Sequence, residues 1–309
     1  MITTIFKKST PINYSLIGIL IIIFFLFTQK NLNFETFSVV DWIQKSGDLA
    51  VSLFSFAVID FISKRNGLTK DNGYTGFFYI LFLLFFPSIF NNTYLLIANF
   101  CVMLSLRRLI SLQTLKFSKE KIFDASFWIF VASLFHFWSI IFILLVFISI
   151  LFHVGRDYRN WVLPFIAFFS VIIGFIFFSL LVDKSLIWQF LDNIYISFEF
   201  YYFKSIFQNI SLSLFVMTAF FFVSMLIFSL SNRPLLLNSS YKKILFWFFL
   251  GLVIFILSPN KSNDILIFTF APLTIMASSF VEITQLKWQQ EVAFFVVLIC
   301  GLICFFAQL

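Results

Sequence analysis

Long uninterrupted apolar runs divide this chain, and they restrict its fold more than any other feature. Two examples are Leu16–Leu26 and Val216–Phe228, neither of which contains a charged residue. A helix of about 20 apolar residues crosses a hydrocarbon core of roughly 30 Å. Within lipid every backbone N–H and C=O must be paired inside the protein, so only helices and closed barrels span it. Barrel strands alternate apolar and polar residues, and these runs do not. The sequence therefore predicts an all-α, polytopic integral membrane protein.

The composition excludes a soluble domain of any size. Of the 309 residues, 61% are hydrophobic and 11% are charged, whereas roughly a quarter of a soluble domain is charged. The 52 Phe residues against 9 Gly residues predict a bundle packed through aromatic rings instead of close glycine contacts. We interpret the net charge of +7 as basic cytoplasmic loops. We therefore expect one transmembrane domain over residues 1–309, surrounded by membrane lipids, with no nucleic acid as a partner.

The apolar runs predict about eleven crossings. A single helix over 124–153 would be about 45 Å long at about 1.5 Å per residue, so this region is expected to be a short helix pair. The predicted spans are 14–28, 49–63, 74–90, 93–107, 124–137, 139–153, 161–182, 209–230, 244–258, 265–282 and 292–308.

With these crossings, 16 of the 21 basic residues fall on one side of the membrane. The positive-inside rule then places the N-terminus inside and the C-terminus outside. Phe, Ile, Lys and Asn have AT-rich codons, so their abundance indicates a bacterium and hence its cytoplasmic (inner) membrane. Three segments are expected to lie along the membrane surface: about 34–48 and 185–207 outside, and about 109–123 inside.

Few charged residues fall within the predicted spans, and a charge there is costly. Asp60 is the acid that lies well inside a span, and Lys64 follows it by one helical turn. Residues four apart face each other on a helix, which favours an ion pair near the inner boundary. The alternative is a buried role for Asp60, such as proton relay.

Two acids in the first outer loop are candidate catalytic residues. Asp41 either binds a metal or acts as a general base on an acceptor hydroxyl; the alternative is a solvated interfacial acid. Asp48 is either a second such group or the N-cap of the span that follows, because Asp before an apolar run suits that position. On the same side, Lys261 is a candidate phosphate-binding residue and His136 a candidate substrate-binding residue. The alternatives are a tight turn for Lys261 and a packing role for His136.

The order of features resembles the C-type glycosyltransferase superfamily, whose multi-span enzymes take sugars from lipid-linked phosphate donors at the outer face. Asn91–Arg108 resembles the span before that fold's cytoplasmic connection, and Asp124–Ile150 with Arg156–Phe169 resembles its short helix pair and the following span. Phe268–Leu273 resembles a late span after an outer polar turn. The chain, especially at its start, Phe6–Tyr14, also resembles a multi-pass family of flavobacterium-like bacteria.

The resemblance implies a catalytic or metal-binding acid in the first outer loop, which Asp41 matches first and Asp48 second. It implies a cationic group in the late outer turn, where Lys261 stands. No cofactor is indicated by the residues themselves, and a divalent metal is implied only for a glycosyltransferase. The first functional hypothesis is therefore transfer of a sugar from a lipid-linked donor at the outer face. The second is a non-catalytic subunit or scaffold bound to other envelope membrane proteins, and the third is a transporter.

Overall fold

The computed structural model describes residues 2–30, 38–192, 194–196, 205–259 and 261–309, and this part of the chain is helical without any strand. The α-helices are α1 (Ile2–Ile5), α2 (Pro11–Thr28), α3 (Val39–Arg65), α4 (Tyr74–Leu83), α5 (Thr93–Ser111), α6 (Ser118–Phe135), α7 (Ile143–His153), α8 (Arg159–Leu181), α9 (Ser185–Asp192), α10 (Ile206–Ser229), α11 (Leu235–Leu257), α12 (Ile267–Ile283) and α13 (Lys287–Gln308). The 3₁₀ turns are η2 (Pro87–Asn91), η3 (Leu112–Thr114), η4 (Phe137–Phe142), η5 (Leu230–Asn232) and η6 (Asn263–Leu266).

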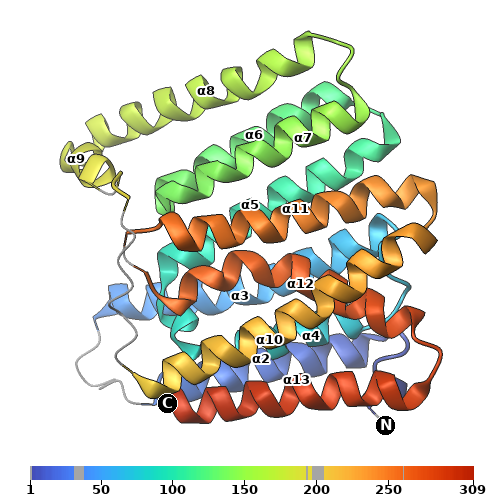
Figure 1. The fold of residues 1–309 in the computed structure, drawn as a ribbon. Coiled ribbons are helices and arrows are strands. Elements are labelled where there is room, and N and C mark those ends of the chain that lie inside the picture. The colour runs from blue at the N-terminus through green and yellow to red at the C-terminus, as the bar shows by residue number, and fades with distance from the viewer. Residues whose placement is uncertain (1, 31–37, 193, 197–204, 260) are drawn as a thin grey trace.

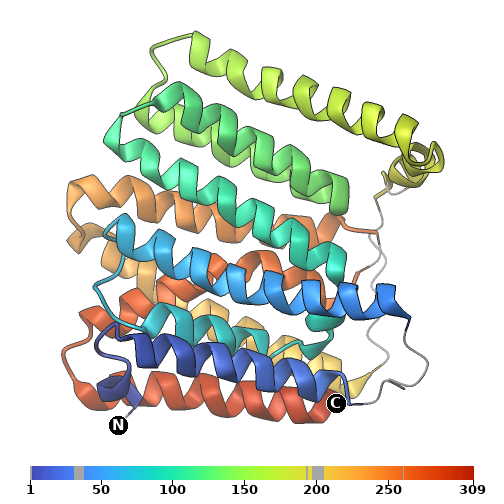
Figure 2. The same ribbon diagram turned by 180° about the vertical axis from the view of Figure 1, so that it is seen from behind.

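The long helices lie side by side, and the chain passes back and forth between the two ends of the bundle (Figures 1 and 2). The N-terminus lies at one end, here called the N-terminal end, and the C-terminus lies at the other, the C-terminal end (Figure 1). The short helix α9 lies at the C-terminal end, beyond the last turn of α8 (Figure 1).

Helices α4 and α12 form the centre of the bundle. All ten residues of α4 are buried, and α12 is buried along nearly its whole length. A helix that is apolar on every side is stable only when neighbours surround it. Here α12 contacts α4, α5, α10 and α11. Aromatic rings fill the space between them, as where Phe86 stacks on Phe270 with ring centroids 6.2 Å apart.

Helix α8 forms one margin of the molecule, on the side opposite α13 (Figure 1). It packs against α6 and makes fewer contacts with α7 and α9. Its outward side chains are large and apolar, such as Phe169, Ile173 and Phe177, and all three are exposed. An apolar face of this kind suits hydrocarbon as its solvent.

Eight helices in the described part of the chain are long and apolar enough to cross a membrane: α2, α3, α5, α8, α10, α11, α12 and α13, some with their 3₁₀ extensions. They coincide with eight of the eleven predicted spans. The other three predicted spans coincide with α4 and η2, with α6, and with η4 and α7. These elements are shorter or more polar than the eight.

The predicted surface segments differ from the observed elements. Residues 39–48 form the first turns of α3 and continue directly into the span, while 34–37 lie outside the described residues. Segment 109–123 is not a separate helix, because α5 and η3 lead through Leu115 and Phe117, both with left-handed backbone angles, into α6. In segment 185–207, α9 covers Ser185–Asp192, and residues 193 and 197–204 lie outside the described part.

Candidate functional site

Asp41 stands in the first turn of α3, where its carboxylate caps the helix. The backbone N–H and the hydroxyl of Ser38 donate to Asp41 Oδ2 at 2.9 and 2.8 Å, and the Asp41 N–H donates to Ser38 Oγ at 3.3 Å. This reciprocal arrangement is a capping box, which pairs N–H groups that the first helical turn leaves without partners. The side chain is exposed and lines neither cavity at this end of the bundle.

Asp48 is not a helix cap, so that interpretation of the sequence was wrong. It is the tenth residue of α3, and only 1% of it is exposed. The apolar run begins after Asp48, but the helix begins nine residues earlier because Ser38 supplies the cap. The spacing Ser38-x-x-Asp41 is the signal that could have located this start.

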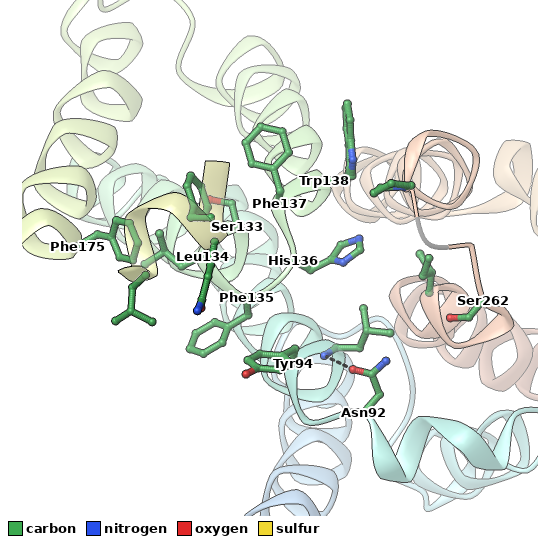
Figure 3. A pocket seen from close by; sticks show the side chains of 16 residues that line it. Asn92, Tyr94, Ser133, Leu134, Phe135, His136, Phe137, Trp138, Phe175 and Ser262 are labelled. Carbon is green, nitrogen blue, oxygen red and sulfur yellow. Dashed lines mark hydrogen bonds between the residues drawn. The ribbon is translucent and has the colours of Figure 1, made fainter. Parts of the chain in front are cut away.

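A cavity of about 480 Å³ opens at the C-terminal end of the bundle. Four separate stretches of the chain build it: the start of α5, the junction of α6 with η4, the region from α8 to α9, and the turn before η6 (Figure 3). Its aromatic lining comes from Tyr94, Phe135, Phe137, Trp138, Phe175 and Phe190. Its polar lining comes from Asn92, Ser133, His136, Gln189 and Ser262.

Several polar groups of this lining are held in place by the protein. Asn92 caps α5, because the Leu95 N–H donates to Asn92 Oδ1 at 3.3 Å (Figure 3). Ser133 donates to the carbonyl of Phe130 at 2.7 Å. The indole ring of Trp138 belongs to the wall, while its N–H is buried and has no hydrogen-bond partner in the described part of the chain.

His136 is the sequence-predicted site residue that the structure places in this cavity. It lies in the turn between α6 and η4, outside the helices, and its Nε2 is 3.1 Å from Ser258 Oγ. Desolvation lowers the pKa of His136 to about 4, so the ring is neutral at pH 7. A neutral imidazole offers one donor and one acceptor. The residue can therefore orient a hydroxyl without carrying charge.

Lys261 belongs to the turn that borders the cavity but does not line it. Its neighbours Pro259 and Ser262 do, while its own side chain is 6% exposed. A second cavity of about 330 Å³ lies at the same end and is lined mainly by polar groups, including Thr28, Ser88, Asn91, Gln208 and Gln308. None of the four predicted site residues lines it. The structure thus brings His136 to a cavity and leaves Asp41, Asp48 and Lys261 outside both.

The Asp60–Lys64 ion pair predicted from spacing is confirmed, with Lys64 Nζ 2.8 Å from Asp60 Oδ2. The hydroxyl of Tyr14 donates to the same Asp60 oxygen at 2.8 Å and also contacts the Lys64 ammonium. The group lies in the last turns of α3, at the N-terminal end of the bundle and away from the cavity of about 480 Å³.

The aromatic lining could not be recognised from the sequence, because Phe occurs throughout the spans. A divalent metal, which only the resemblance implies, does not fit the cavity. Hard cations take carboxylate and carbonyl oxygens, and no carboxylate lines the cavity in the described residues. The same residues contain no group of three or more His, Cys, Asp and Glu side chains arranged to hold a metal.

The number and apolar character of the helices define the class of protein. The described chain carries eight helices suited to span a membrane, as a multi-pass α-helical membrane protein does. The model of one family, described as a family of unknown function (DUF6427), matches residues 1–309, and the chain belongs to that family. No match is found among the curated proteins or among the solved structures.

Proposed function

We propose that the chain crosses a bacterial cytoplasmic membrane eleven times, with its N-terminus inside. In this arrangement α4 with η2, α6, and η4 with α7 each make a crossing beside the eight longer helices. The distribution of basic residues supports it, because most of them fall in the connections and the adjoining helical turns at the N-terminal end of the bundle. The cavity of about 480 Å³ then opens at the outer face.

Labelling of single cysteines tests this topology. In a variant without Cys101, Cys300 and Cys304, a membrane-impermeant thiol reagent on intact spheroplasts is expected to label Ser185→Cys. It is expected to label Arg156→Cys only after the membrane is opened. Labelling of both positions from the same side would overturn the topology.

We propose further that the outer cavity binds the sugar head group of a lipid-linked sugar. The observation that carries this is a cavity with aromatic walls and neutral hydrogen-bonding groups. Sugar rings present apolar C–H faces that pack on aromatic rings, and hydroxyls that pair with amide, imidazole and indole groups. Helix α8 contributes Phe175 to the lining and has an exposed apolar outer face, which suits a ligand that carries a long hydrocarbon tail.

Glycosyl transfer is the reaction class that the resemblance implies for such a ligand, with Asp41 as candidate base. The geometry supports binding more strongly than transfer, because no described residue in the cavity lining supplies a carboxylate. We therefore propose that the protein recognises the lipid-linked sugar, and that glycosyl transfer is the reaction that would follow this binding.

Photocrosslinking tests the binding. A photoreactive polyprenyl-phosphate sugar is expected to label the wild-type protein in membranes, and Trp138→Phe is expected to reduce labelling roughly tenfold by replacing the indole ring of the wall with a smaller one. The matched control is Trp188→Phe, since Trp188 is 69% exposed on α9 and does not line the cavity. Equal labelling of wild type, Trp138→Phe and a cavity-filling Ser262→Trp variant would contradict the proposal.

A non-catalytic subunit is the second candidate function, and the exposed apolar face of α8 favours it. That face meets no other described helix of the chain, and a partner helix could cover it as well as lipid does. Purification in mild detergent is expected to retain a second membrane protein if this function is correct. A lone monomer would count against it.

A further inference from the structure

A cavity of about 680 Å³ opens at the N-terminal end of the bundle, beside the last turns of α3. Along α3 the aromatic lining residues Phe56 and Phe61 come first, and the charged lining residues Lys64 and Arg65 follow. From Phe56 to Arg65 the helix rises about 14 Å at about 1.5 Å per residue. The cavity therefore has apolar walls toward the middle of the bundle and charged groups at its end, which is the polarity of a phospholipid in one leaflet.

Two buried polar atoms of this lining have no partner in the described part of the chain. Asp60 is 6% exposed, and its Oδ2 is occupied by the Tyr14 hydroxyl and the Lys64 ammonium, each at 2.8 Å, while its Oδ1 has no partner. Thr69 is also 6% exposed, and its Oγ1 has no partner. Its backbone N–H donates to the Ser63 carbonyl at 3.4 Å, which folds it back onto α3. Since buried polar groups nearly always have partners, these two oxygens indicate a ligand that brings hydrogen-bond donors.

The same part of the cavity carries an excess negative charge. The carboxylate of Asp71, whose side chain is 82% exposed, lies 3.9 Å from Lys64 Nζ, the ammonium that also pairs with Asp60. Two carboxylates thus lie within 4 Å of one ammonium, and a second ammonium would balance the remaining charge. The rings of Tyr14 and Phe56, with centroids 6.2 Å apart, border this cavity and also favour a cation.

Arg65 supplies the opposite charge at the open end of the cavity. Its side chain is exposed, its guanidinium carbon lies 5.6 Å from the centroid of the Phe61 ring, and it forms no ion pair with any described acid. A guanidinium pairs well with phosphate oxygens. The rise from Asp60 to Arg65 along α3 is about 7.5 Å, which a phosphate joined by two carbons to an ammonium spans with both contacts made.

We propose that this cavity binds a phospholipid with an ethanolamine head group. The primary ammonium donates to Asp60 Oδ1 and Thr69 Oγ1 and is attracted by Asp71. The phosphate pairs with Arg65, and an acyl chain lies along Phe56. A choline head group has no N–H to donate, and a glycerol head group has no ammonium. The inference goes beyond sugar binding and is independent of it, because none of these residues lines the outer cavity.

Native mass spectrometry of the delipidated, full-length protein in detergent tests the proposal with three phospholipids that have the same acyl chains. The wild type is expected to bind one ethanolamine lipid with a dissociation constant at least tenfold lower than for the choline or glycerol lipid. Thr69→Val and Asp71→Asn are each expected to reduce this preference to less than about threefold and to leave binding of the glycerol lipid unchanged. Arg65→Gln is expected to weaken binding of all three lipids about tenfold, because all three carry the phosphate.

Arg156→Gln and Asp157→Asn are matched controls, because they change charged residues at the same end of the bundle that do not line this cavity. Both are expected to bind the three lipids as the wild type does, and the thermal midpoint of each lipid-free variant shows whether it is folded. Water-soluble phosphoethanolamine, which has no acyl chain, is expected to compete at least a hundredfold more weakly than the lipid.

Equal binding of the three lipids by the wild type, or a preference that survives both Thr69→Val and Asp71→Asn, would overturn the proposal. Tightest binding of the glycerol lipid would also overturn it and would show that Arg65 merely attracts anionic lipid. Competition by phosphoethanolamine as strong as by the lipid would assign the cavity to a soluble amine instead.

Discussion

Substituting Asp60 and Lys64 one at a time should show whether their ion pair stabilises the fold. The two substitutions should lower the free energy of unfolding by different amounts, because each remaining partner has different neighbours. The two side chains are 9% and 17% exposed and meet at 2.8 Å. Removing one partner of a fully buried pair costs about 3–5 kcal/mol. In Asp60→Asn, Lys64 keeps the Tyr14 hydroxyl and a carboxylate of Asp71 at 3.9 Å. We therefore expect a loss of about 1–2 kcal/mol.

In Lys64→Met, Asp60 keeps only the hydrogen bond from Tyr14 at 2.8 Å. A loss of about 2–3 kcal/mol is expected, since a buried carboxylate is left with one donor. The double variant has no charge to bury, so it should lose about 1–2 kcal/mol less than the sum of the single variants. Unfolding in mixed micelles, followed by tryptophan fluorescence, measures all three.

The matched control is the exposed pair Lys119 and Asp157, whose side chains are 49% and 44% exposed at 3.6 Å. Asp157→Asn is expected to change stability by less than about 0.5 kcal/mol. If Asp60→Asn and Lys64→Met are additive, or as mild as Asp157→Asn, then the pair does not stabilise the fold. Proton relay would then be the better explanation for a buried acid at Asp60.

Three further predictions follow from particular residues. Gly76→Ala should cost about 1–3 kcal/mol in the same unfolding assay, because its Cβ would lie 2.3 Å from the ring of Phe56, whereas Gly174→Ala, with nothing within 4 Å, should be tolerated; equal effects would refute this. The pKa of His136 falls to about 4 on folding, so the unfolded state binds a proton more readily between about pH 6.5 and pH 4. The free energy of unfolding should therefore be constant with respect to His136 above about pH 6.5 and fall toward pH 4, by about 1–3 kcal/mol for this partly exposed ring. A His136→Asn variant should decline less, and parallel pH profiles would contradict the assignment. Leu115→Asn should raise the free energy of unfolding by about 0.5–1 kcal/mol, since Asn tolerates the left-handed backbone at φ 56°; a lower thermal midpoint would count against it.

Local spacing in the sequence was sufficient wherever the controlling interaction was local. The long apolar runs identified the positions of eight helices suited to span a membrane. The separation of four residues between Asp60 and Lys64 was enough to predict their ion pair. The start of α3 was missed because hydropathy was given more weight than the capping pattern at Ser38 and Asp41.

Tertiary packing decided the rest, and the polar residues show why. Asp48 has the sequence context of a helix cap, yet it is buried because α3 begins earlier and packs against α5. His136 resembles any lone histidine until the start of α5, the region from α8 to α9 and the turn before η6 enclose a cavity around it. The sequence alone determines that the apolar runs lie in hydrocarbon and are helical, because each run must pair its own backbone N–H and C=O groups there. Which polar groups meet follows only from the packing of distant helices, because no repeating pattern along the chain encodes those contacts.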